Sequence, residues 1–175
     1  MTQYRKNARA CFLLYNEGDY FITICTKDRR HHFGEIRNGK MHLSAIGKYV
    51  DSQLASAHSF NPNIEILLSV VMPNHIHAIV QVLDVSSEEY MPPLQRSPNY
   101  CLRAFPERKR SVPELTRYIN SFKGAVTKYA RSLGVDFHWQ DRYNDHCIRG
   151  NHDGNRIAEY IMTNIENWND DSYNG

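Results

Sequence analysis

The sequence has no long apolar run, no paired cysteines and little net charge. Its four cysteines are spread along 175 residues without a C-x-x-C pair, which argues against a zinc cluster and a disulfide scaffold. No stretch approaches the ~20 apolar residues of a membrane-spanning helix, and the N-terminal residues contain no apolar segment of signal-peptide length. We therefore expect a soluble protein of the reducing cytoplasm with no membrane partner. The net charge of +2 does not by itself select a partner.

The first half of the chain has apolar segments with two different spacings. Apolar residues recur at three- and four-residue steps over 43–60, which predicts an amphipathic helix capped by Ser44. Residues 72–74 predict a tight turn, and residues 27–40 a charged connection. Strands are predicted where β-branched and aromatic residues gather, at residues 19–26, 63–72 and 75–82.

The second half of the chain continues with a long loop and three further elements. Ser111 and Glu114 predict a capping box at the start of a helix, Gly134 follows its end, and Asp153 is placed to cap a terminal helix. We predict a proline-containing loop over residues 84–110, followed by a helix over 111–133. A short strand over 146–149 and the terminal helix over 153–168 come next.

These elements follow one another in the order β-α-β-β-α-β, with a helix at the end. This order is typical of an α+β fold, the ferredoxin-like split βαβ sandwich, with helices on one face of an antiparallel sheet. The length fits a single domain over residues 1–175. In this arrangement the third strand, residues 75–82, lies in the middle of the sheet.

Two histidines on that third strand are the first candidates for a functional site. His75 and His77 are separated by Ile76, so their side chains point to the same face of the strand. Their Cα atoms would lie roughly 6 to 7 Å apart, close enough to share one metal ion. On spacing alone, such a pair is more often an ordinary half-exposed pair than a set of metal ligands.

The terminal helix has two polar residues four positions apart. Tyr160 and Asn164 lie on one side of the helix, beside the apolar stripe that contains Ile161. One interpretation is that Tyr160 packs at the edge of the core while Asn164 is solvated. The other is that Asn164 lends an oxygen to a hard ion such as Mg²⁺ or Mn²⁺, while Tyr160 attacks a phosphorus atom.

Basic residues gather in the second half of the chain. Between residues 96 and 131 there are nine lysines and arginines but only two acidic residues. This asymmetry predicts a phosphate-binding surface whose affinity for DNA falls steeply with salt. The alternative is a solvated basic helix face. The candidate DNA-binding residues are Arg103, Arg108, Lys109, Arg110, Arg117, Lys123, Lys128, Arg142 and Arg149.

Three segments, VVMPNHIHAIV, WQDRYNDHCIR and AEYIMTNIENW, together resemble the single-tyrosine HUH, or IS200-like, transposases. The resemblance is strongest to the branch of REP-associated tyrosine transposases and covers nearly the whole chain. It implies a ferredoxin-like enzyme that cuts and rejoins single-stranded DNA through a 5′-phosphotyrosine intermediate, leaving a free 3′-hydroxyl.

Matched position by position, the resemblance implies that His75 and His77 bind Mg²⁺ or Mn²⁺ and that Asn164 completes the metal site. It implies Tyr160 as the nucleophile. The implied partner is single-stranded or hairpin DNA, bound by a monomer or a homodimer. Ile165 stands where the family pattern has proline, so we expect the end of the terminal helix to differ from that pattern.

Three other interpretations stay open. A histidine-triad nucleotide hydrolase alternates three histidines with apolar residues, but the third place here is Ile79. A non-catalytic nucleic-acid-binding module can use the same sheet, although the histidines, tyrosine and asparagine then have no role. A domesticated relative that no longer mobilises its own gene would keep the same catalytic set. Among the other tyrosines, Tyr118 and Tyr129 fall on an apolar helix stripe, and Tyr143 lies in WQDRYNDH.

Overall fold

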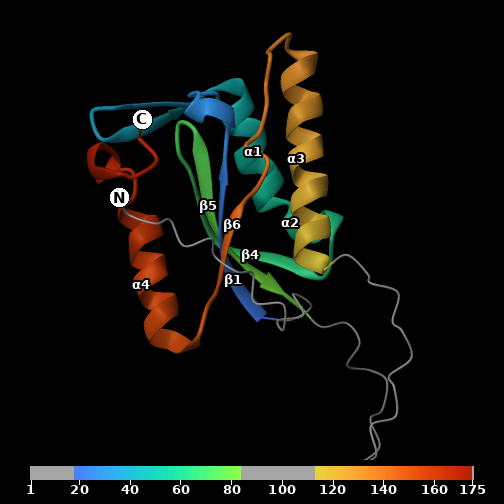
Figure 1. Ribbon diagram of the computed structural model, residues 1–175, viewed down its shortest axis with the longest axis vertical. Helices are drawn as coiled ribbons and strands as arrows, with labels where there is room; N and C mark the ends of the chain where they lie inside the picture. Colours follow the sequence, from blue (N-terminus) through green and yellow to red (C-terminus); the bar gives the residue numbers. More distant parts are fainter. Residues whose placement is uncertain (1–17, 84–112, 175) are drawn as a thin grey trace, which may run out of the picture.

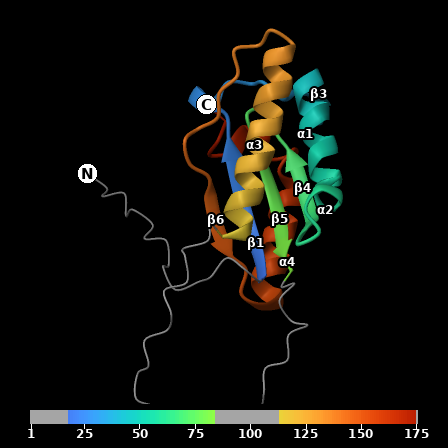
Figure 2. The ribbon, with the colours of Figure 1, turned by 90° about the vertical axis from the view of Figure 1, so that its right-hand side faces the viewer.

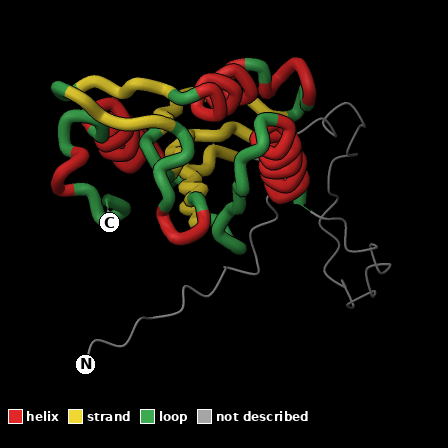
Figure 3. Tube along the Cα trace, turned by 90° about the horizontal axis from the view of Figure 1, so that it is seen from above, coloured by secondary structure: helices red, strands yellow, loops and turns green. Residues whose placement is uncertain are grey.

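The computed structural model describes residues 18–83 and 113–174, with a central antiparallel sheet in the order β4-β5-β1-β6. These strands are Ile64–Val71, His75–Val82, Gly18–Cys25 and Asn144–Cys147. One face of the sheet is covered by α1 (Ala45–Ala55), α2 (Ala57–Phe60) and α3 (Glu114–Ser132), and the other by α4 (Gly150–Thr163) (Figures 1 and 2). Seen from above, the strands lie between these two groups of helices (Figure 3). The predicted α+β, ferredoxin-like arrangement is confirmed.

The histidine strand β5 has the predicted bounds, His75–Val82, and lies in the middle of the sheet. It pairs with β1 on one side and β4 on the other, both antiparallel. Pro73 precedes it and cannot donate to the backbone ladder, which favours a turn before the strand. The alternation of side chains then divides β5 into two faces. Ile76 and Val80 pack toward α1 and α3, whereas His75 and His77 lie on the side of α4, whose Tyr160 contacts His77.

The region predicted as a charged connection contains a β-hairpin instead. Strands β2 (Gly34–Arg37) and β3 (Lys40–Leu43) pair with each other and form a separate two-stranded sheet. Asn38 and Gly39 connect them, both with positive φ, which is the conformation that an Asn-Gly hairpin turn requires. The sequence contains this Asn-Gly turn signal, but the charged residues around it led to the prediction of a connection without strands.

Two helix boundaries also differ from the sequence prediction. The helix predicted over 43–60 begins at Ala45, where the Ser44 hydroxyl accepts a hydrogen bond from the Gly47 amide as expected of a cap, and it is interrupted at Ser56. Helix α3 begins at Glu114 after Pro113. The predicted loop and the Ser111 end of the capping box lie outside the described residues.

The last strand and the last helix differ more from the sequence prediction. Strand β6 begins at Asn144, earlier than predicted, because Asn144 already pairs with Thr23 of β1, and it ends at Cys147, which pairs with Tyr20. Helix α4 begins at Gly150, so Asp153 is not its cap; the Asp153 carboxylate instead accepts a hydrogen bond from the Arg149 amide at 3.2 Å. The helix ends at Thr163 and a separate 3₁₀ turn follows at Trp168–Asp170. Among the described residues, no helix combines the length and apolar character needed to cross a bilayer.

Candidate active site

The two histidines of β5 are buried side by side under α4 and the C-terminal residues. Their exposed fractions are 0% for His75 and 1% for His77. The two Nε2 atoms lie 3.0 Å apart, so both rings direct the same nitrogen to one point. The half-exposed alternative is therefore wrong.

The other nitrogen of each ring bonds to a neighbouring polar side chain. His75 Nδ1 lies 2.8 Å from Asn74 Oδ1, and His77 Nδ1 lies 2.8 Å from the Thr23 hydroxyl. Thr23 is the β1 residue paired with His77. Side chains that hold the second nitrogen of a histidine fix the orientation of the ring and are usual around metal ligands.

Burial keeps both imidazoles neutral at physiological pH. It lowers the pKa of His75 from its ordinary value of 6.5 to about 3, with a smaller contribution from Arg29. It lowers the pKa of His77 to about 3 as well, assisted by the neighbouring His75 and opposed by Asp171. A neutral imidazole has one nitrogen lone pair that can bind a metal ion.

Asp171 joins this cluster from the segment after α4, which sequence reasoning did not predict. Its Oδ2 lies 3.6 Å from His75 Nε2, and its side chain is 2% exposed. Because the low pKa of His75 keeps that ring neutral, this contact is not an ion pair. Ligand atoms of His75, His77 and Asp171 all lie within 4.8 Å of one another. Within the described ranges, no other three His, Cys, Asp or Glu side chains meet in this way.

Two buried side-chain oxygens at the site are unpaired among the described residues, one from Asp171 in the cluster and one from Asn164, whose side chain forms a hydrogen bond with Tyr160. Asp171 Oδ2 and Asn164 Oδ1 have no hydrogen-bond partner within the part of the chain that the structure describes. Leaving such an atom buried and unpaired costs about 1 to 3 kcal/mol, and more where the group is charged. A divalent cation bound by the two imidazole nitrogens would also satisfy these oxygens, and both atom types are suitable ligands. The residues present therefore fit a metal ion.

Tyr160 reaches the same point from α4. Its hydroxyl lies 3.2 Å from His77 Nε2, and the residue is 40% exposed. Its ring meets that of Phe21 edge to face at 6.1 Å, and Phe21 also stacks on His77. Burial raises the pKa of Tyr160, as does the charge of Asp171, while a hydrogen bond with Asn164 lowers it. The structure thus brings together the four residues predicted as nucleophile and metal ligands.

The candidate DNA-binding residues that the structure describes do not form one cluster. Arg103, Arg108, Lys109 and Arg110 lie outside the described residues. Arg117, Lys123 and Lys128 lie on α3, which covers the other face of the sheet. Lys123 already donates to the Gln140 carbonyl at 2.7 Å and lies over the Trp139 ring. Arg142 and Arg149 are exposed, and Arg149 immediately precedes α4.

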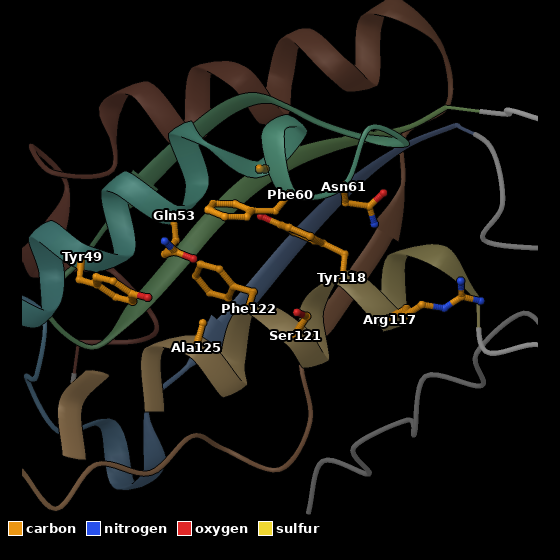
Figure 4. Close-up of a pocket in the computed structure, with 10 residues that line it drawn as sticks. Tyr49, Gln53, Phe60, Asn61, Arg117, Tyr118, Ser121, Phe122 and Ala125 are labelled. Atoms are coloured by element: carbon orange, nitrogen blue, oxygen red, sulfur yellow. The ribbon is translucent and has the colours of Figure 1, made fainter. Parts of the chain in front are cut away.

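A pocket of about 440 Å³ lies between α1, α2 and α3, away from the histidines (Figure 4). Tyr118 and Phe122 project into it from α3, and Phe60 from α2. Tyr118 is buried, as predicted from its place on the apolar stripe, and Tyr129 stacks on Tyr49 with ring centroids 4.1 Å apart. The pocket is thus a feature of the helical layer and takes no part in the histidine site.

Comparison with known proteins identifies a relative and the fold of the chain. No family model matches the chain. It is 35% identical over 158 residues to an uncharacterized protein of Haemophilus influenzae, covering 89% of this chain and 84% of the relative. Among solved structures, it matches a REP-associated tyrosine transposase bound to a REP hairpin, with 18% identity, a TM-score of 0.56 and coverage of 94% of this chain and 72% of that one.

A second solved structure, a protein of Deinococcus radiodurans proposed to be a transposase, aligns with 14% identity and a TM-score of 0.47 over 93% of this chain and 97% of that one. The chain therefore belongs to one family with the Haemophilus influenzae protein, and its fold is that of a REP-associated tyrosine transposase.

Proposed function

We propose that this protein is a metal-dependent enzyme that cleaves and rejoins single-stranded DNA through a 5′-phosphotyrosine intermediate. The observation that carries the proposal is the position of the Tyr160 hydroxyl, 3.2 Å from His77 Nε2. It lies at the edge of a buried cluster in which two imidazole nitrogens converge and two oxygens have no partner among the described residues. A buried set of this kind has no evident role in a module that only binds nucleic acid.

His75, His77, Asn164 and Asp171 would hold the ion, Mg²⁺ or Mn²⁺. When bound, such an ion neutralises charge on a scissile phosphate and orients its oxygens for in-line attack. Residues of the protein itself position the nucleophile and leave room for the DNA strand. Phe21 packs against both Tyr160 and His77 and limits the positions that the nucleophile can take. The exposed part of Tyr160 leaves a path for an unpaired strand to approach.

The chemical step forms a bond between the Tyr160 oxygen and phosphorus and breaks the bond between phosphorus and the 3′ oxygen. The tyrosine gives up its hydroxyl proton and the departing 3′ oxygen gains one. The hydroxyl is protonated at neutral pH, and burial raises its pKa further, with the hydrogen bond from Asn164 acting in the opposite direction. The attack therefore needs a group that takes up the hydroxyl proton. The phosphotyrosine bond is itself a phosphodiester, so the reverse attack by a 3′-hydroxyl rejoins the strand without a nucleotide cofactor.

We further propose that the DNA partner contains a hairpin. The solved transposase of the same fold was determined bound to a REP hairpin. In this protein, Arg142 and Arg149 are exposed near β6 and the start of α4. They are the described candidates nearest in sequence to the helix that carries Tyr160, and we assign phosphate contacts to them. The basic residues of α3 lie on the opposite face, so they would contact a different part of the DNA.

The test is to incubate the protein with Mg²⁺ or Mn²⁺ and a panel of hairpin-bearing single strands, and to score covalent adducts on a denaturing gel. We expect a metal-dependent adduct that Tyr160→Phe abolishes and chelation by EDTA prevents. Tyr143→Phe is the matched control and should still form the adduct. An adduct that survives Tyr160→Phe but not Tyr143→Phe would overturn the assignment. Failure of the wild type to react with any strand would favour a binding module.

A further inference from the structure

Asn74, the last residue of the turn before β5, is buried and uses both ends of its side-chain amide. Its Nδ2 donates to the Arg29 carbonyl at 3.2 Å and to the Tyr173 carbonyl at 2.9 Å. Carbonyl oxygens only accept hydrogen bonds, so the atom facing them must be the amide nitrogen. The atom 2.8 Å from His75 Nδ1 is therefore the amide oxygen.

This orientation determines where the proton of His75 lies. The Asn74 oxygen can only accept, so His75 Nδ1 must carry the hydrogen. A neutral imidazole has one N–H, which leaves Nε2 with its lone pair. That lone pair faces His77 Nε2 at 3.0 Å and the Asp171 carboxylate at 3.6 Å.

Thr23 holds His77 in a less restrictive way. Its hydroxyl lies 2.8 Å from His77 Nδ1 and can either donate or accept. Without a metal ion, His77 Nε2–H can donate to the lone pair of His75. With an ion bound, the proton can move to Nδ1 and donate to Thr23, which frees Nε2. The two histidines thus differ in one property: the tautomer of His75 is fixed and that of His77 is adjustable.

We propose that Asn74 is a positioning residue for the metal site, since it fixes His75 in the tautomer that presents Nε2 and at the same time anchors the segment that carries Asp171. The second part follows from the bond to the Tyr173 carbonyl, two residues after Asp171 and 99 positions from Asn74. One side chain thereby orients a nitrogen ligand and an oxygen ligand. This inference rests on the proposed metal site and extends it to a residue that touches neither metal nor DNA.

The test begins with the wild type. Long-range proton–nitrogen NMR spectra of metal-free protein with labelled histidines report the tautomer of each ring, and the peaks of the nine histidines can be assigned with single substitutions. We expect His75 to be protonated at Nδ1. Protonation of His75 at Nε2 in the wild type would overturn the proposal, and this measurement needs no change at Asn74.

Two substitutions then separate the two roles. Asn74→Asp keeps an oxygen for His75 Nδ1–H but removes the donor to Tyr173, whereas Asn74→Leu removes both. We expect His75 to keep its tautomer in Asn74→Asp and to lose it in Asn74→Leu. Affinity for Mn²⁺ should fall in Asn74→Leu by about 10- to 100-fold, the usual effect of losing an outer-shell partner, and should recover in part in Asn74→Asp.

An unchanged Mn²⁺ affinity in folded Asn74→Leu would contradict the proposal. The outcome is also separable from that of the proposed function, because neither the tautomer nor the Mn²⁺ affinity depends on DNA cleavage. If the wild type bound Mn²⁺ through the predicted tautomer but formed no DNA adduct, only the proposed chemistry would fail.

Discussion

Both faces of strand β5 are largely buried, but one is apolar throughout and the other, which we call the polar face, combines His75 and His77 with Ile79. On one face, Ile76 and Val80 have no exposed surface and belong to the apolar core under α1 and α3. On the other, His75 and His77 are just as inaccessible under α4 and the C-terminal residues. The apolar face gains stability from burial, about 25 cal/mol per Å² of apolar surface. The polar face places desolvated groups together, which is unfavourable unless they are paired.

Burial alone therefore does not identify a functional site. What identifies it is the convergence of two imidazole nitrogens with oxygens of Asn164 and Asp171 that are unpaired within the described ranges. One unpaired atom is not sufficient, because the Tyr118 hydroxyl on α3 also lacks a partner in the described part of the chain. A fold selected only for stability would fill this space as it fills the other face. The comparison therefore predicts that changes on the apolar face affect stability and leave metal binding intact, while changes on the polar face do the reverse.

The largest effect on stability is expected from the apolar face. Ile76→Ala removes buried methyl and methylene groups from the core and should lower the free energy of unfolding by about 2 to 5 kcal/mol. The affinity of the folded protein for Mn²⁺ should stay within about twofold of wild type, a change of roughly 0.4 kcal/mol or less. Urea unfolding and calorimetry measure the two quantities. A loss of Mn²⁺ affinity as large as the loss of stability would mean that the faces are not independent.

The matching change on the polar face is His77→Gln, which removes one converging nitrogen at similar volume. Affinity for Mn²⁺ should fall by at least about 100-fold, more than the usual loss from an outer-shell change. The free energy of unfolding without metal should change by only about 1 kcal/mol, because glutamine replaces the imidazole with another polar side chain of similar volume and only about one hydrogen bond is affected. If this variant unfolded as readily as Ile76→Ala yet bound Mn²⁺ normally, His77 would be a structural residue.

A smaller effect is expected from Asp171→Asn. The substitution removes the charge beside the two neutral rings but retains an oxygen that can accept from the Tyr173 amide, as Asp171 Oδ1 does now at 2.7 Å. We expect the Mn²⁺ affinity to fall about tenfold, or about 1.4 kcal/mol, without a loss of metal-free stability. Asp170→Asn, one residue earlier and exposed, is the control. Equal affinities for the two variants would remove Asp171 from the ligand set.

The smallest effect is expected at Asp153, which lies outside the histidine site. Both of its carboxylate oxygens accept hydrogen bonds. Hydrogen bonds from His146, then Arg156 and the Arg149 amide, hold the pKa of its carboxyl below the ordinary value of 3.8. The folded pKa is lower than the unfolded one, so the stabilisation is present above about pH 4 and is lost as the pH falls. The difference in free energy of unfolding between Asp153→Asn and wild type should be full at pH 6 and should shrink progressively as the pH falls below about 4 toward the lowered folded pKa. A difference that grows as the pH falls would contradict this sign.

The sequence was sufficient for the parts of the fold that depend on local patterns. The bounds of β5 followed from alternation after Pro73, and its place in the sheet from the order of the elements. The hairpin at residues 34–43 was missed because charged residues surround the Asn38-Gly39 turn. The end of α4 at Thr163 shows that Ile165, in place of proline, does not prevent the helix from stopping there.

Only part of the candidate site could be predicted from the sequence, because only part of it depends on local patterns. His75 and His77 were visible in the pattern of one strand, whereas Tyr160 and Asn164 were identified by resemblance. Asp171 was missed because the last residues have no periodicity. Their position depends on contacts with residues far away in the chain, such as the bond between Asn74 and the Tyr173 carbonyl.

The most direct test of the central claim is to locate the DNA on the protein. Trypsin cleavage after Arg156 releases residues 157–175 as one peptide, which contains both Tyr160 and Tyr173. Both rings lie beside His77, with centroids 5.1 and 5.7 Å away. Fragmentation of the DNA-linked peptide in a mass spectrometer distinguishes the two. We expect the phosphate on Tyr160, and a phosphate on Tyr173 or on any other peptide would be incompatible with Tyr160 as the nucleophile.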